Sequence, residues 1–282
     1  MTTDARGPIP PELLVLERGR TDLRYWRDLW RYRELLYFLA RRDVAVRYKQ
    51  TVMGVAWALI RPLLTVIVFT VLFGRIAQLP SDGVPYSLLV FAGMLPWFLF
   101  SGAVSESGNC LVSNSNLLSK VYFPRLLVPA AAMAVALVDF VIGFVLLLLM
   151  MAWFGYAPSA RILALPLFVL LACAAAFGLG LWFAALNVKY RDFQFVIPFL
   201  LQIGLYVSPI GFSSTVIPDA WRLLYSANPM VGVIEAFRWA LLGSAFTLRA
   251  DAMVLSVGLT GVLLASGLWY FRRTERSFAD DI

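Results

Sequence analysis

The side chains in this sequence that could bind an anionic group are its clustered basic residues. Eleven of the 24 lysines and arginines precede residue 50. The last of these are Arg41, Arg42, Arg47 and Lys49, and Arg61 follows at the start of the first long apolar stretch. A guanidinium group pairs with phosphate oxygens through two parallel hydrogen bonds and stays charged near neutral pH. Such a cluster can hold an anionic group, or it can serve only as a positive anchor at a membrane surface.

The sequence offers few other groups for catalysis. It contains no histidine, and its two cysteines are Cys110 and Cys173. The phosphate-binding loop G-x-x-x-x-G-K-[ST], the zinc motif H-E-x-x-H and the nucleophile motif G-x-S-x-G are all missing from it. We therefore expect a protein that is not an enzyme and that binds no metal or cofactor itself. If the protein takes part in active transport, another polypeptide supplies the energy.

Six long apolar stretches follow this basic cluster. The composition is 61% hydrophobic and the mean hydropathy is +0.78. A bilayer core of about 30 Å is crossed by about 20 apolar helical residues. Barrel strands would instead be about 10 residues long and would alternate in polarity, which runs such as 145–154 do not. The sequence predicts an all-α polytopic membrane protein with transmembrane helices near 62–79, 84–105, 126–154, 162–188, 193–214 and 252–271.

The distribution of basic residues predicts the orientation of these helices. With a cytoplasmic N-terminus, 18 lysines and arginines fall on the inner side, near the ends of the chain and in the connections 106–125 and 189–192. Five fall on the outer side. Because cytoplasmic loops carry the excess of positive charge, we expect both termini in the cytoplasm. The first 34 residues lack an apolar core of the signal-peptide kind, so we expect no cleaved signal peptide.

Composition divides the chain into three parts. We expect residues 1–19 to form a flexible cytoplasmic tail and residues 20–53 to form a cytoplasmic amphipathic interface region. Residues 54–282 should form the six-span membrane domain. In residues 20–33 four arginines spaced by 4, 3 and 4 positions share one helix face, while Leu23, Trp26, Leu29 and Trp30 share another. This pattern is typical of a helix that lies in the membrane interface.

Two polar segments interrupt the apolar sequence. Residues 105–125 predict a cytoplasmic connection in which Ser113, Asn114 and Ser115 can cap a short exposed helix. That helix is either a docking element for a partner or part of an ordinary connector. Asp139, by contrast, lies within an expected span, and we expect it to face inward with a partner or water, because an unpaired charge in a bilayer is costly.

Residues 208–243 are only moderately apolar and contain Pro209, Pro218 and Pro229. They predict two short amphipathic helices, 218–226 and 230–242, because Pro218 can open the first and Asn228-Pro229 can cap and start the second. Arg222, Glu235 and Arg238 prevent either helix from crossing a bilayer alone. We expect a re-entrant pair of helices at the outer face; a surface loop is the alternative.

Aromatic residues make up 15% of the chain. Many will anchor the protein at the two membrane interfaces. The other interpretation is a lining for a sugar chain, since pyranose rings rest their C–H faces on aromatic rings. The residues expected to line such a channel are Trp57, Phe69 and Phe73 of the first span and Phe199 and Tyr206 of the fifth. The second span contains further aromatics.

Four ordered blocks resemble a known family. They are LLYFLARRDVAVRYKQTVMGVAWALIRPLL (35–64), VYFPRLLVPAA (121–131), LNVKYRDF (186–193) and residues 208–243. Together they are similar to the membrane subunit of bacterial polysaccharide ABC exporters, a class with Wzm-type O-antigen permeases and relatives for capsule and teichoic acid. The resemblance covers about residues 20–275. It implies a homodimer in the bacterial inner membrane, bound to two copies of a separate ATPase subunit that holds ATP and Mg²⁺.

The resemblance also implies roles for particular residues. The exported polysaccharide is carried on a polyprenyl diphosphate, and the channel runs between the subunits along the first and fifth spans. The interface helix would be Asp22–Arg42, the coupling helix would lie within Ser113–Val121, and the gate helices would be Pro218–Ser226 and Met230–Leu242. The residues that would first meet the diphosphate are Arg41, Arg42, Arg47, Lys49 and Arg61. Those that would couple to the ATPase are Ser113, Asn114, Asn116, Leu117 and Lys120. Those of the outer gate are Pro218, Trp221, Asn228, Pro229, Glu235 and Arg238.

Other functions remain open at this point. A related permease could export a small lipid, a drug or a glycolipid. A membrane-embedded glycosyltransferase would need an acidic or arginine cluster on an outer loop, where the sequence supplies few carboxylates. We expect no nucleic-acid partner.

Overall fold

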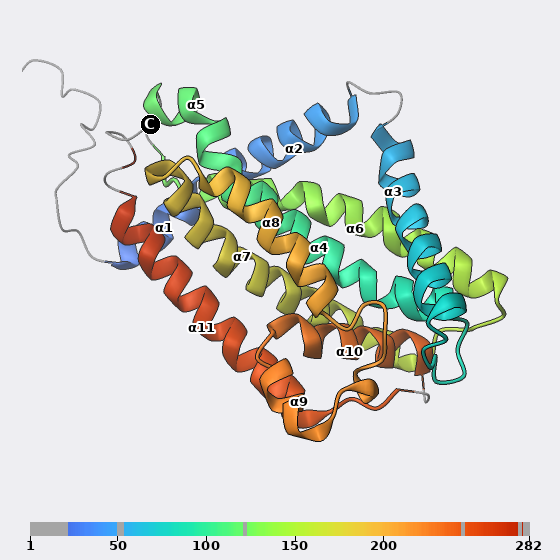
Figure 1. Ribbon diagram of the computed structural model, residues 1–282. Coiled ribbons are helices and arrows are strands. Elements are labelled where there is room, and N and C mark those ends of the chain that lie inside the picture. Colours follow the sequence, from blue (N-terminus) through green and yellow to red (C-terminus); the bar gives the residue numbers. More distant parts are fainter. Residues whose placement is uncertain (1–21, 50–53, 121–122, 244–245, 276–277, 279–282) are drawn as a thin grey trace, which may run out of the picture.

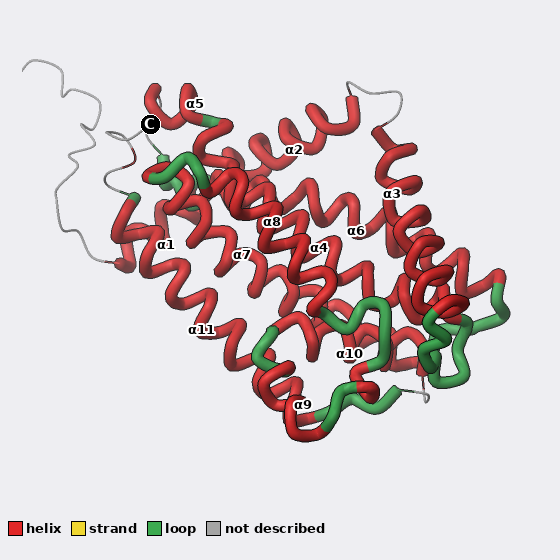
Figure 2. The backbone as a smooth tube through the Cα atoms, in the orientation of Figure 1, coloured by secondary structure: helices red, strands yellow, loops and turns green. Residues whose placement is uncertain are grey.

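The computed structural model describes residues 22–49, 54–120, 123–243, 246–275 and residue 278 (Figure 1). The expected tail 1–19 lies outside the described residues. Within these ranges every regular element is a helix (Figure 2). In chain order the elements are α1 (Asp22–Arg31), α2 (Arg33–Lys49), α3 (Gly54–Phe69), the π-helix η1 (Thr70–Ile76), α4 (Tyr86–Ser113), α5 (Ser115–Lys120), α6 (Leu127–Trp153), η2 (Ala160–Ala164), α7 (Leu165–Lys189), α8 (Phe193–Val207), η3 (Ser214–Val216), α9 (Asp219–Tyr225), α10 (Pro229–Leu242) and α11 (Ala250–Thr274).

Five helical segments in the described residues are long and apolar enough to cross a membrane. They are Ala56–Ile76, α4, α6, Ala160–Lys189 and α11. The predicted all-helical, polytopic class is confirmed. The sixth expected span corresponds to α8, a shorter apolar helix of 15 residues that ends at Val207 rather than near 214. Pro209 explains the early end, because the residue before a proline avoids helical geometry and Ser208 is extended.

The connection predicted for 105–125 is partly wrong, because α4 continues through residues 105–113. Polar residues can extend this buried helix since their side chains find partners within the fold. The Ser107 hydroxyl donates to the Pro129 carbonyl over 3.2 Å, and the Asn187 amide donates to the Asn109 side chain over 2.9 Å. The short helix expected after this point is confirmed as α5.

Helix α4 forms the centre of the bundle. In its most apolar 18-residue window, 78% of the residues are buried, against 17% for the window of Ala56–Ile76. Helices α6, α7 and α10 pack directly against α4. The structure therefore consists of a firmly packed centre, with α3 and α8 at its margin (Figure 1).

Glycines allow α7 and α11 to approach closely. A Cβ atom built at Gly178 would lie 2.6 Å from the Leu263 carbonyl carbon, which is closer than atoms pack. Small residues at helix contacts are the usual means of association in membranes, because backbones then meet directly. This contact fixes α11 along one side of the bundle.

Helix α5 and the helices α9 and α10 lie at opposite ends of the bundle. Figure 1 shows α5 and the C-terminal end of α11 at one end, and α9 and α10 at the other. The helices expected at 218–226 and 230–242 are confirmed as α9 and α10. Asn228 caps α10 as expected, because its side-chain oxygen accepts the Met230 N–H over 3.0 Å and Pro229 follows it.

Arg238 joins α10 to the rest of the fold. Its side chain is buried, with 2% of its surface exposed. The guanidinium donates to the backbone carbonyls of Leu89 at 3.2 Å, Phe212 at 2.9 Å and Ile210 at 2.9 Å. One side chain therefore satisfies carbonyls of α4 and of the turn after α8 at the same time. Arg238 was expected to act at an outer gate, and the structure gives it this structural role in addition.

Replacing Arg238 with leucine should destabilise the protein, because three backbone carbonyls, two of them in buried contacts, lose this donor. At about 1–3 kcal/mol for each unsatisfied group, we expect a loss of about 3 kcal/mol or more. Thermal unfolding of the purified protein in detergent measures this loss. The control is Arg191→Leu, at an exposed position between α7 and α8. Equal melting temperatures for the two variants would contradict the structural role of Arg238.

Candidate functional site

A cavity of about 1090 Å³ opens between α3, α4, α6 and α8. Its aromatic lining consists of Trp57, Phe91, Trp97, Phe98, Phe140 and Tyr206. Its uncharged polar lining consists of Thr65, Ser101, Ser105 and Gln202. Four charged residues, Arg47, Arg61, Glu106 and Asp139, complete the polar part. Aromatic faces beside hydrogen-bonding groups are suited to ligands that carry both C–H surfaces and hydroxyls.

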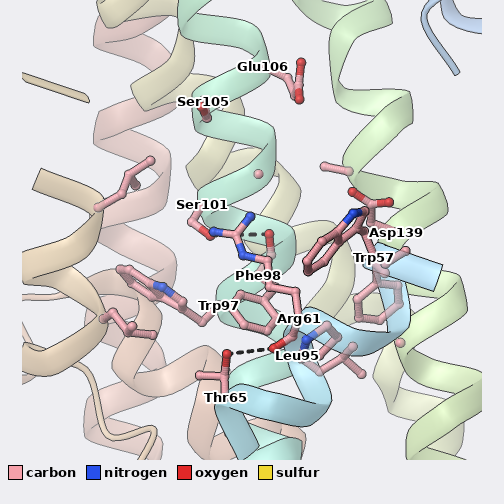
Figure 3. Close-up of a pocket in the computed structure, with 18 of the residues that line it drawn as sticks. Trp57, Arg61, Thr65, Leu95, Trp97, Phe98, Ser101, Ser105, Glu106 and Asp139 are labelled. Carbon is pink, nitrogen blue, oxygen red and sulfur yellow. Dashed lines mark hydrogen bonds between the residues drawn. The ribbon is translucent and has the colours of Figure 1, made fainter. Parts of the chain in front are cut away.

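The polar and charged groups of the cavity come from several helices. Figure 3 shows Ser101, Ser105 and Glu106 along α4, and Asp139 on the neighbouring helix α6. Trp57, Arg61 and Thr65 come from α3. The Thr65 hydroxyl donates to the Arg61 carbonyl over 2.8 Å. The basic group on α3 and the carboxylates on α4 and α6 thus share one cavity.

Arg47, Glu106 and Asp139 form an ion-pair cluster at this cavity. Arg47 extends one terminal nitrogen to Glu106 Oε1 and the other to Asp139 Oδ2, each over 2.8 Å. The Tyr48 hydroxyl donates to the other Asp139 oxygen. The cluster joins α2, α4 and α6, and it confirms the expectation that Asp139 faces inward with a partner. Sequence reasoning missed Glu106, although Ser101 and Ser105, four residues apart, already mark a polar face of α4.

The five basic residues expected to meet a diphosphate are not all together. Arg47 and Arg61 line the cavity. Arg41 and Lys49 line a separate hollow on α2. Arg42 instead donates to Asp43 at 2.7 Å and to the Asn114 side chain at 2.6 Å.

The expected channel aromatics also separate. Trp57 and Tyr206 line the cavity, where Trp97 and Phe98 of α4 join them. The Phe69 ring is buried, with its centroid 5.3 Å from that of Phe73. Phe199 is 62% exposed on α8 and does not line the cavity. Two of the five expected aromatics therefore line the cavity of a single chain.

The expected coupling residues lie around α5. Ser113 is the last residue of α4, and Asn114 caps that helix by donating from its side chain to the Cys110 carbonyl over 2.9 Å. Asn116 and Lys120 are exposed and Leu117 is half-buried. Leu118 belongs to the same buried cluster as Leu39 of α2. Helices α5 and α2 thus contribute to one apolar cluster, and the Arg42–Asn114 hydrogen bond joins α2 to the residue directly before α5.

The chain after α5 is fixed to both ends of the described sequence. Glu275 accepts hydrogen bonds from the Arg125 N–H over 2.9 Å and from the Tyr25 hydroxyl over 3.1 Å. Burial raises the pKa of the Glu275 carboxyl, and these donors together with the nearby guanidinium groups oppose that shift. The Arg125 guanidinium also donates to the Glu275 carbonyl over 2.6 Å. The start of α6 is thus tied to α1 and α11.

The remaining expected gate residues lie on α9 and α10. Pro218 precedes α9, and Trp221 is 63% exposed on it. The Asn228 side chain donates to the Ser208 hydroxyl over 2.9 Å, which joins α10 to the end of α8. Glu235 is half-buried on α10. The structure thus groups the expected gate residues at one end of the bundle.

Several known permease and transport proteins for polysaccharides are similar to this chain over most of both sequences. The O-antigen export system permease protein RfbA of Myxococcus xanthus is 28% identical over 262 residues, which is 92% of this chain and 100% of that protein. A protein of the same name from Klebsiella pneumoniae is 24% identical over 88% of this chain and 94% of its own length. The polysialic acid transport protein KpsM of Escherichia coli is 25% identical over 84% and 92%.

Membership of one protein family explains the membrane helices, the cavity and these similarities. The ABC-2 type transporter family matches residues 34–242, which run from the second residue of α2 to the end of α10 and therefore contain the whole cavity lining. The protein is a transport component rather than an enzyme. This chain belongs to the ABC-2 type transporter family and is a multi-pass membrane permease subunit.

Proposed function

We propose that this chain is the permease subunit of an ATP-driven exporter of a polysaccharide linked to polyprenyl diphosphate, with O-antigen as the expected polymer. The exporter works in the bacterial inner membrane, as a homodimer bound to two copies of an ATPase subunit. The observation that carries the proposal is the similarity to O-antigen permeases along 92% of the chain. The mixed aromatic and polar lining of the cavity supports it.

The cavity offers the two kinds of contact that such a substrate needs. Aromatic rings such as Trp57 and Tyr206 provide flat apolar faces for sugar rings, while hydroxyls and amides bind the sugar oxygens. Arg47 and Arg61 supply guanidinium groups for phosphate oxygens. Weak, repeated contacts of this kind hold a polymer without trapping it.

The arrangement of the ends supports a transport path across the membrane. In our proposal α8 is the sixth span, and both termini are cytoplasmic. The ends of the bundle then have separate tasks, since α5 docks the ATPase in the cytoplasm while α9 and α10 form a re-entrant gate at the outer face. ATP binding and hydrolysis by the partner move α5, and that motion reaches the gate through the packed bundle.

A capsular polymer is the second candidate substrate. The similarity to polysialic acid transport proteins favours it, at 25% identity over 238 residues. A polyanionic chain would also contact Arg47 and Arg61 along its length, whereas a neutral polymer would meet them only through its diphosphate. The two candidates therefore differ in the part of the substrate that the arginines bind.

The function is tested by deleting the gene in its host and analysing surface glycan by mass spectrometry. Co-expression of this chain with its ATPase subunit should restore a polymer that the deletion strain retains inside the cell. Loss of an O-antigen supports the first candidate, and loss of a capsule supports the second. Unchanged surface glycan in the deletion strain would contradict both.

Changing Asn116 to alanine together with Leu117 to aspartate should weaken ATPase docking. Both residues lie on α5, and the aspartate places a charge on its half-buried apolar position. We expect at least a ten-fold drop in the ATPase that co-purifies with this chain, while the permease remains folded. Val112→Thr, at an exposed position before α5, is the control. Undiminished co-purification of the ATPase would refute the docking role.

Replacing Arg61 with glutamine should weaken substrate binding without unfolding the protein. Arg61 is exposed to the cavity, and a hydrogen bond to a charged group is worth about 1.5–3 kcal/mol. We expect an increase of about ten-fold or more in the substrate concentration needed for half-maximal transport. Arg75→Gln is the matched control, because Arg75 is exposed in η1 of the same continuous helix. A normal concentration dependence in the Arg61 variant would exclude a binding role.

A further inference from the structure

Arg47 is the point at which α2 reaches the cavity. Among the described residues that line the cavity, Arg47 alone comes from α2. The same helix contacts the residue directly before α5, because Arg42 donates to the Asn114 side chain. Helix α2 therefore connects the expected ATPase-docking element to the cavity, with one arginine contact at each place.

The carboxylates of the ion-pair cluster occupy both terminal nitrogens of Arg47. Glu106 and Asp139 each accept from a different nitrogen over 2.8 Å. A phosphate that approached Arg47 for bidentate pairing would need these same two nitrogens. Phosphate and carboxylates are therefore competitors for one guanidinium group.

The cluster is built so that this exchange is feasible. The side chains of Arg47, Glu106 and Asp139 are 43%, 41% and 32% exposed. Water that fills the cavity would hydrate all three, and ion pairs that remain exposed to water are weak. A diphosphate also carries more charge than a single carboxylate, and Arg61 lines the same cavity on the opposite helix.

We propose that Glu106 and Asp139 are positioning residues that hold Arg47, and with it α2, on the cavity wall until the phosphate group of the substrate displaces them. This proposal rests on the proposed function and adds a means of regulation to it. When Arg47 pairs with phosphate, the two carboxylates lose their counter-ion and face a further negative group. The attachment of α2 to α4 and α6 weakens, and α2 transmits the change to α5. Substrate binding in the cavity thereby signals to the ATPase.

The test measures ATP hydrolysis by the full complex of this chain and its ATPase in nanodiscs. The variant Glu106→Gln with Asp139→Asn keeps the shapes of both side chains and removes their charge. We expect its basal ATPase rate to rise at least three-fold, because α2 is released without substrate. Stimulation by a sugar-free polyprenyl diphosphate should fall from the wild-type value towards none.

Two variants separate positioning from general structural damage. Asp82→Asn removes a carboxylate at an exposed loop position away from the cavity and should retain wild-type rates. Glu106→Gln alone leaves the Asp139 contacts in place and should give an intermediate basal rate. A double variant that binds its ATPase and keeps both the wild-type basal rate and the wild-type stimulation would overturn the proposal.

A distance measurement reports the motion of α2 directly. Spin labels at Val46 on α2 and Val112 at the end of α4 occupy exposed positions, in a background with Cys110→Ala and Cys173→Ala. Without ligand, the double variant should show the altered distance that the wild type adopts only with polyprenyl diphosphate. Identical distances in both proteins under both conditions would contradict the release of α2.

The two proposals fail in different ways. If polyprenyl diphosphate leaves the wild type unchanged while the double variant still raises the basal rate and alters the distance, the substrate assignment fails and the positioning role is supported. If polyprenyl diphosphate stimulates the wild type and the double variant equally, the substrate assignment is supported and the positioning role is overturned.

Discussion

Charged groups within a membrane protein must be paired or hydrated, and this requirement organises the cavity. Glu106 and Asp139 lie on helices that are otherwise apolar enough to cross a bilayer. Their partner, Arg47, comes from outside those spans, on α2. The cluster therefore ties α2, which packs against α6, to α4 as well, and it makes one part of the cavity charged. Aromatic rings from α3, α4, α6 and α8 line the rest of the cavity and give the site its mixed character.

A second arginine, Arg238, has the corresponding task at the other end of the bundle, and its side chain is buried. Arg238 fixes α10 to α4 and to the turn after α8 through three backbone carbonyls. The two arginines differ in one physical respect, which is their access to water. Arg238 is 2% exposed and therefore costly to displace, whereas Arg47 is partly exposed and can change partners. Rigid attachment at one end and exchangeable attachment at the other suit a transporter that responds to its substrate.

The sequence was sufficient to predict the helical class, the two helices α9 and α10, the cap at Asn228 and the inward orientation of Asp139, because these depend on local patterns and on the cost of a charge in lipid. It was not sufficient for the end of α4 or for Glu106. A polar run such as 105–113 resembles a loop until its partners, Pro129 and Asn187, are known. The division of the basic residues between cavity, hollow and Asn114 likewise depends on tertiary packing that no local pattern encodes.

The proposed function and the proposed role of Arg47 both require that the lipid-linked substrate binds in the cavity. A polyprenyl diphosphate with a photoreactive group beside its phosphates tests this directly, after irradiation of the membrane-embedded complex and peptide mapping by mass spectrometry. We predict labelling of the cavity segments of α3 and α4, around Trp57, Arg61 and Ser105, with competition by unlabelled polyprenyl diphosphate. Labelling confined to the outward surface of α11, or labelling that the unlabelled lipid does not reduce, would contradict the account.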